Sequence, residues 1–71
     1  MNIKVGDQLK DNDPRMSNRV LTVTSLGMVT TMGVQSVRAK DGTGREVSIL
    51  TRRIHCDGKP RRSGFDIVHA G

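Results

Sequence analysis

The stretch VRAKDGTGREVSIL, residues 37–50, decides the expected fold because it has the pattern of two strands joined by a tight turn. Its centre, DGTG at residues 41–44, is typical of hairpin turns, since Asp-Gly tolerates positive φ without a steric penalty. In the returning strand, residues 45–50, Val47 and Ile49 lie on the same face because successive side chains of a strand alternate. The sequence therefore predicts an antiparallel hairpin here.

Strand-like segments continue on both sides of this hairpin. Val and Thr are abundant and favour strands through their branched side chains, whereas glycine interrupts the chain too often for typical helices. The longer strand before the turn is expected to be kinked or bulged at Gly33, and a single helical or 3₁₀ turn is expected at residues 51–54. The complete set of expected strands covers residues 3–9, 19–27, 28–40, 45–50 and 64–68.

These segments predict an all-β fold, either a small five-stranded antiparallel barrel or a strongly bent sheet, with one short 3₁₀ turn. A flat sheet of this size would leave two unpaired edges and an uncovered apolar face, so strong bending meets a physical need. The 71 residues are expected to form one small β domain, residues 1–71. The predicted core consists of Val5, Leu9, Leu21, Val23, Leu26, Val37, Val47, Ile49, Ile54, Phe65 and Ile67.

The composition narrows the functional classes. Cys56 is the only cysteine and cannot form an internal disulfide, which fits a reducing compartment. No apolar run approaches the roughly 18 residues that span a bilayer, and no signal-peptide core opens the chain. We therefore expect a soluble protein of the cytoplasm. Phe65 is the only aromatic residue, so a platform of rings that stack on nucleic-acid bases is not expected.

Positive charge is the strongest functional signal. The chain has 12 Lys and Arg residues against 7 Asp and Glu residues, a net charge of +5. The basic stretch, TRRIHCDGKPRRSG at residues 51–64, concentrates cations around Asp57, and Gly58 and Pro60 are expected to shape it as a clamp. Arginine forks match phosphate and carboxylate oxygens in two-point contacts. The predicted contacts to an acidic partner are Arg52, Arg53, Lys59, Arg61 and Arg62, extended by Arg38, Lys40 and Arg45.

The thiol and imidazole of the basic stretch do not form a convincing reactive site. His55 and Cys56 are adjacent, so in an extended chain their side chains point to opposite sides, whereas a nucleophile needs its base within hydrogen-bond reach. With His69 they would supply three metal ligands without the paired spacing of structural zinc sites. We therefore expect no enzyme, no cofactor, no metal and no small-molecule substrate.

The segment DNDPR, residues 11–15, could suggest a calcium loop. The EF-hand pattern requires glycine at its sixth position and glutamate at its twelfth, where this chain has Met16 and Thr22. A structural turn explains the segment better, because Asp and Asn side chains bond neighbouring backbone N–H groups. The expected turn residues are Asp11, Asn12, Asp13, Pro14 and Arg15, with Asp13 paired to Arg15 or Arg19.

Several of these elements also occur together in known proteins. In order along the chain they are VGD (5–7), DNDPR (11–15), NRVLTV (18–23), GREVSI (44–49), RRI (52–54) and SGFDIV (63–68). This order resembles a group of small bacterial and phage-encoded β-domain proteins of unknown function. The resemblance covers residues 5–68 and implies a compact β domain without implying an activity. Asn18 stands where the group often has glycine, and residues 55–63 are longer than its usual link. The pattern is also loosely similar to SH3-like barrels of the KOW or Tudor sort.

Two functions remain open on the sequence. The first is a small accessory protein that binds nucleic acid, mainly through backbone phosphates. The alternative is a protein-interaction factor, which the resemblance makes a phage-encoded modulator or inhibitor of a host protein in the bacterial cytoplasm. It would dock through the basic stretch or a barrel edge, with Met28 and Met32 as adaptable apolar contacts. In either case we expect a monomer or a weak homodimer.

Overall fold

The computed structural model describes residues 3–16, 19–57, 59 and 61–68. Strands and two 3₁₀ turns make up its regular structure, so the all-β class is confirmed. The 3₁₀ turns are η1 (Pro14–Met16) and η2 (Thr51–Arg53), and η2 confirms the turn expected before the last strands. The strands are β1 (Gln8–Asp11), β2 (Val20–Leu26), β3 (Val29–Thr30), β4 (Gly33–Val34), β5 (Ser36–Lys40), β6 (Glu46–Leu50), β7 (Ile54–His55) and β8 (Phe65–Val68).

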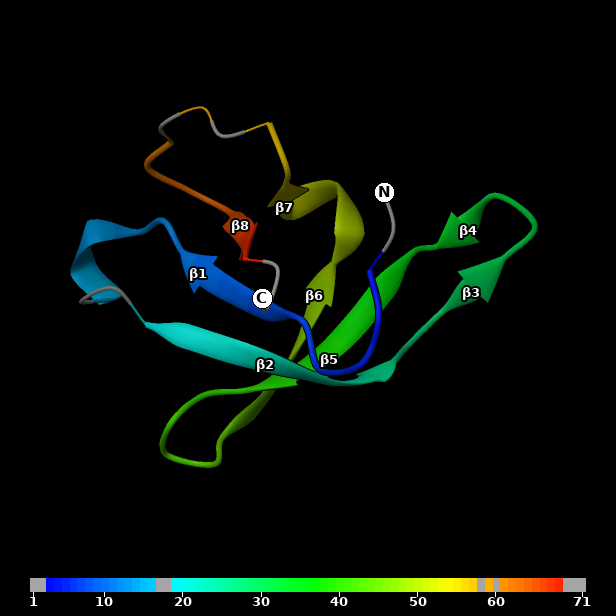
Figure 1. Ribbon diagram of the computed structural model, residues 1–71, viewed down its shortest axis with the longest axis horizontal. Coiled ribbons are helices and arrows are strands. Elements are labelled where there is room, and N and C mark those ends of the chain that lie inside the picture. The colour runs from blue at the N-terminus through cyan, green and yellow to red at the C-terminus, as the bar shows by residue number, and fades with distance from the viewer. Residues whose placement is uncertain (1–2, 17–18, 58, 60, 69–71) are drawn as a thin grey trace.

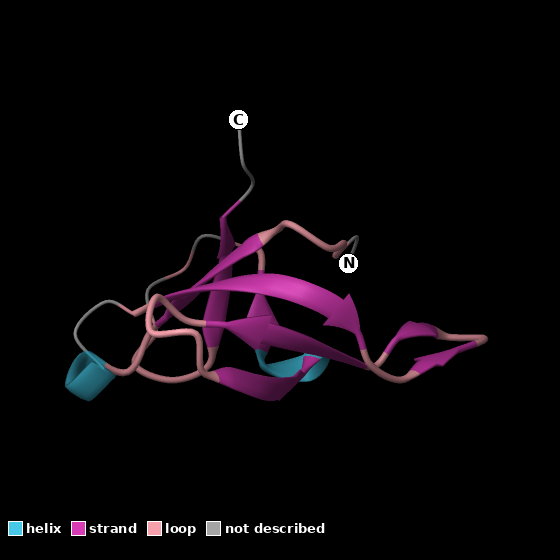
Figure 2. Ribbon diagram, turned by 90° about the horizontal axis from the view of Figure 1, so that it is seen from below, coloured by secondary structure: helices cyan, strands magenta, loops and turns pink. Residues whose placement is uncertain are grey.

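One curled sheet forms the body of the molecule. Six strands follow the order β6-β5-β2-β1-β8-β7, and the sheet bends into an open half-barrel (Figure 1). β3 and β4 form a separate two-stranded hairpin that projects from one end of this body (Figure 2). The expected number of five strands is therefore wrong, because the chain adds a short hairpin and the two-residue strand β7.

The expected strand over residues 28–40 is divided into three. β3 and β4 pair through Val29 and Val34, and the chain turns between them with Gly33 at φ 109°. β5 then begins at Ser36, whose hydroxyl accepts a hydrogen bond from the Met28 N–H at 2.8 Å. Gly33 thus begins β4 directly after a tight turn and does not bulge one long strand.

One strand pair departs from the expected antiparallel arrangement. β7 and β8 pair in parallel, with Ile54 opposite Phe65 and His55 opposite Asp66. Parallel neighbours need a connection that carries the chain back to its starting end. The described residues of this connection are Cys56, Asp57, Lys59 and Arg61 to Gly64.

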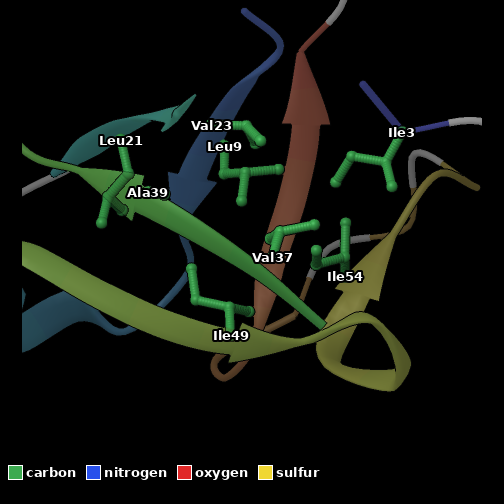
Figure 3. Close-up of a cluster of buried hydrophobic side chains, with 8 residues drawn as sticks. All are labelled: Ile3, Leu9, Leu21, Val23, Val37, Ala39, Ile49 and Ile54. Carbon is green, nitrogen blue, oxygen red and sulfur yellow. The ribbon is translucent and has the colours of Figure 1, made fainter. Parts of the chain in front are cut away.

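The core lies on the concave side of the sheet, where eight side chains converge (Figure 3). The buried residues are Ile3, Leu9, Leu21, Val23, Val37, Ala39, Ile49 and Ile54. Val47, Phe65 and Ile67 are partly buried against them, as is Val34. Most of the predicted core is therefore confirmed, while Ile3 and Ala39 were not predicted.

Two predicted core residues lie at the surface. Val5 is 58% exposed because residues 4–7 form a turn, closed by the Asp7 N–H bonded to the Lys4 carbonyl at 3.1 Å. This turn also delays the first strand, which begins at Gln8 and not at Ile3. Leu26 is 39% exposed because it ends β2 at a position that alternates with the buried Leu21 and Val23, in step with the exposed Thr22 and Thr24.

The β5–β6 hairpin is confirmed at its predicted place, with a different geometry at its turn. The left-handed residue is Gly44, at φ 86°, and not Gly42. The Asp41 carboxylate accepts hydrogen bonds from the Thr43 hydroxyl and from the N–H groups of Thr43 and Arg45. These bonds, the Thr43 hydroxyl first, hold the pKa of Asp41 below its usual value.

Candidate anion-binding surface

The carboxylates of the chain decide which cations remain available. All seven acidic side chains belong to described residues, and each accepts a hydrogen bond or forms an ion pair. Asp7, Asp41 and Asp66 accept hydrogen bonds from backbone, hydroxyl or amide groups. The four ion pairs are Asp11–Arg19, Asp13–Arg15, Glu46–Arg38 and Asp57–Arg61. Within the described residues, eight of the 12 cations therefore have no ion pair.

Arg61 is one of the cations that the fold neutralises. Its two terminal nitrogens donate to the two carboxylate oxygens of Asp57 at 2.6 and 2.8 Å. The same carboxylate accepts the Lys59 N–H at 3.2 Å. The guanidinium, with that N–H, holds the pKa of Asp57 well below its usual range. Because its charge is paired with Asp57 within the loop, Arg61 contributes to the shape of the loop and is less available to an acidic partner than an unpaired arginine.

The two arginines of η2 point to different hollows. Arg53 lines a cleft of about 400 Å³ together with the β6 residues Val47 to Leu50, Arg19 and Phe65. Arg52 lines a groove of about 570 Å³ beside the β3–β4 hairpin. Both arginines are exposed. η2 therefore separates two neighbouring surfaces, each with one unpaired guanidinium.

The end of the basic stretch is held against the DNDPR segment. The Asn12 N–H donates to the Gly64 carbonyl at 3.1 Å, and the Asn12 amide donates to Asp66 at 3.1 Å and to the Ser63 carbonyl at 3.4 Å. Gly64 is buried at φ 74°, where an added Cβ would lie 2.6 Å from the Arg53 carbonyl oxygen. The basic stretch is thus fastened to the body by a contact that sequence reasoning missed, since nothing local links residues 12 and 64.

The DNDPR segment itself is tied by local hydrogen bonds. The Asp11 carboxylate accepts the Asp13 N–H at 3.0 Å, and the Asp13 carboxylate accepts the Arg15 N–H at 2.9 Å. The Arg15 side chain also donates to Asp13, which lowers the pKa of that carboxyl. Arg19 pairs with Asp11 at 2.8 Å, in a partly buried position, and not with Asp13. These contacts organise the turn that receives the basic stretch.

The proposed extension of the basic track lies elsewhere. Arg38 is 3.6 Å from Glu46, and Lys40 lies opposite Glu46 in the β5–β6 register. Arg45 is exposed beside the β5–β6 turn, which projects on the other side of the molecule from β7 (Figure 1). The structure therefore does not bring Arg38, Lys40 and Arg45 together with the basic stretch.

Four of the predicted contact residues keep an unpaired charge near one end of the sheet. Arg52, Arg53, Lys59 and Arg62 are exposed and have no ion pair within the described residues. We call these four residues the cation group. Gly58 and Pro60, which were expected to shape a clamp, lie outside the described residues.

The thiol and imidazole are separate features of this region. Cys56 is exposed and free, whereas the half-buried His55 ring lies beside Gly64. His69 lies outside the described residues. Within residues 3–16, 19–57, 59 and 61–68, no three His, Cys, Asp or Glu side chains gather where they could hold a metal ion.

Comparison with known protein families, with curated protein sequences and with solved structures found no match to this chain. In the part of the chain that the structure describes, no helix has the length and apolar character needed to span a membrane. The relation to the group of small bacterial and phage-encoded β-domain proteins, here called the D-N-D-P-R group after the DNDPR segment, therefore stays a prediction.

Proposed function

We propose that the protein binds nucleic acid through backbone phosphates, with the cation group as its principal contact. One observation supports this most directly: Arg52, Arg53, Lys59 and Arg62 are exposed and unpaired, although every carboxylate of the chain is engaged within the fold. Cations without internal partners are free to replace the counterions of a phosphate backbone.

The residue types make this binding weakly dependent on sequence. Arginine and lysine grip phosphate oxygens, which position a protein on nucleic acid without reading its bases. The only aromatic residue, Phe65, is partly buried against the core and offers no platform for stacking. Four phosphate contacts imply a slope of about −3.6 for log K against log salt on duplex DNA. Between 50 and 200 mM NaCl, the affinity should therefore fall roughly 10²-fold.

Fluorescence anisotropy with a labelled random-sequence duplex and a labelled single-stranded RNA, at these two salt concentrations, tests the proposal. A variant with Arg52→Ala, Arg53→Ala and Arg62→Ala should bind more weakly and have a slope smaller by about 2.7. The control, Lys40→Ala and Arg45→Ala, removes two charges from exposed residues of the β5–β6 hairpin, and the loss of affinity is compared per charge removed. A salt-independent affinity, or an equal loss per charge in both variants, would contradict a localised phosphate contact.

A protein-interaction factor is the second candidate, and the groove beside Arg52 favours it. An apolar groove suits a protein side chain and not a phosphate backbone. We further propose that the fold is SH3-like and related to the D-N-D-P-R group. Two features support this: the strong curl of the sheet, and the pairing of the C-terminal strand β8 with the first strand β1.

A further inference from the structure

The groove on the Arg52 side of η2 is lined in part by exposed apolar side chains. It holds about 570 Å³ and is lined by Met28, Thr30, Met32, Gln35, Leu50, Thr51 and Arg52. Met28 is 63% exposed, Met32 89% and Leu50 45%. Apolar side chains that gather on the surface of a small soluble domain commonly mark a binding site.

The base of this groove is fixed by hydrogen bonds. The Thr51 hydroxyl donates to the carbonyl of Val34 or of Gln35, at 2.9 and 3.1 Å, and the Thr51 N–H donates to the Gln35 carbonyl at 3.0 Å. On the hairpin side, the Gln35 N–H donates to the Met28 carbonyl at 2.7 Å. η2 is thus attached to the β3–β4 hairpin, and hydrogen bonds of the fold hold the two sides of the groove together.

The charge at the groove has one sign. Arg52 is its only charged lining residue, and no carboxylate lines it, although all seven acidic side chains lie within the described residues. An occupant with apolar side chains and a nearby carboxylate would satisfy both features, whereas a basic segment would meet Arg52 with like charge. Long, unbranched methionine side chains can adapt to different apolar shapes.

We propose that this groove binds an acidic amphipathic segment of another protein. An aliphatic side chain of the segment lies between Met28, Met32 and Leu50, and a carboxylate of the segment pairs with Arg52. This binding shares only Arg52 with the phosphate contacts of the cation group, because its other contacts are apolar.

Three fluorescein-labelled dodecapeptides are the probes, and fluorescence anisotropy measures their binding. One alternates Leu-Leu and Glu-Glu pairs, the second replaces Glu by Lys, and the third replaces Leu by Ser. Only the acidic amphipathic peptide should bind. Arg52→Glu should weaken it about tenfold, since an attractive pair becomes repulsive, and Arg53→Glu, on the other side of η2, should leave it within about twofold.

The apolar wall has its own matched pair of variants. Met28→Ser combined with Met32→Ser should weaken the acidic peptide at least about tenfold through lost apolar contact. Val29→Ser changes a residue of the same hairpin that is about as exposed as Met28 but does not line the groove, and should have little effect. Far-UV circular dichroism and urea unfolding confirm that each variant is folded.

Four results would overturn the proposal: no binding of the acidic peptide, equal binding of the basic or Ser-containing peptide, equal loss in Arg52→Glu and Arg53→Glu, or a dimer in sedimentation velocity that Met32→Ser dissociates. The nucleic-acid assay on the same variants distinguishes the two proposals. Phosphate binding should weaken comparably in Arg52→Glu and Arg53→Glu, because both arginines belong to the cation group.

Discussion

Replacing Gly64 by alanine should destabilise the protein by two separate mechanisms. Gly64 has φ 74°, and an ideal Cβ there would lie 2.6 Å from the Arg53 carbonyl oxygen and 2.7 Å from Nε2 of His55. Gly44 is the matched control, since it has φ 86° but nothing within 4 Å of its Cβ position. The two substitutions share the backbone penalty, and only Gly64→Ala adds a steric overlap.

The expected magnitudes follow from these two contributions. A left-handed residue with a Cβ costs about 1–2 kcal/mol, which is the whole expected effect of Gly44→Ala. Displacing the Arg53 carbonyl and the His55 ring adds about 1–3 kcal/mol, as in other overpacked sites. Gly64→Ala should therefore cost about 2–5 kcal/mol, comparable to the total stability of about 3–5 kcal/mol expected for a domain of this size.

Urea unfolding followed by far-UV circular dichroism measures this difference, because the chain has no Trp or Tyr for fluorescence. Gly44→Ala should shift the midpoint moderately at unchanged slope, whereas Gly64→Ala should leave little or no folded baseline. Equal free energies of unfolding in the two variants, within about 0.5 kcal/mol, would refute the close contact between Gly64, Arg53 and His55.

Two further predictions concern the ion pairs. Arg19→Met leaves the Asp11 carboxyl, whose side chain is 7% exposed, without its cation. The loss of stability measured by calorimetry should be about 2–3 kcal/mol, less than for a fully buried pair because the Arg19 side chain is partly exposed. An unchanged melting temperature would contradict this prediction, and adding Asp11→Asn should restore part of the lost stability. Arg61 holds the pKa of Asp57 well below its usual range, so the stabilisation from this pair should be complete above about pH 5 and fade as the pH falls. In a carboxyl NMR titration, the Asp57 midpoint should rise toward about 3.9 in Arg61→Ala, and an identical midpoint in both proteins would count against the pair.

Local patterns in the sequence correctly predicted several strands of the fold. The β5–β6 hairpin, β2 and β8 follow alternating residues or turn-forming glycines, and they lie where expected. The two errors in the predicted core have different causes. Val5 belongs to a turn closed by a backbone hydrogen bond, which alternation does not reveal. Leu26 lies on the exposed face of β2, where alternation from Leu21 and Val23 places it.

The pairing of β7 with β8 could not be read from the sequence. Two residues, Ile54 and His55, are too few to show a period. Gly64, the residue before β8, is held by the distant contact with Asn12. Long-range backbone contacts of this kind have no signature in a single sequence.

The candidate contacts were predictable as a set of cations but not as a surface. The Asp57–Arg61 pair has an i,i+4 spacing that could have suggested it, although that spacing is informative only in a defined local conformation. The Arg38–Glu46 pair follows from the hairpin register, because Glu46 lies opposite Lys40, next to Arg38 on the same face. When the arginines in such ion pairs are removed from the eight predicted contact residues, a smaller set of unpaired cations remains.

The internal use of carboxylates explains why more cations lack an ion pair than the net charge of +5 suggests. Asp7, Asp41 and Asp66 accept hydrogen bonds from neutral groups, so they leave three more cations without an ion pair than a one-to-one pairing would. Turn formation and surface charge are therefore linked in this chain. A carboxylate that closes a turn forms no ion pair with an exposed cation, so the fold decides which cations stay unpaired.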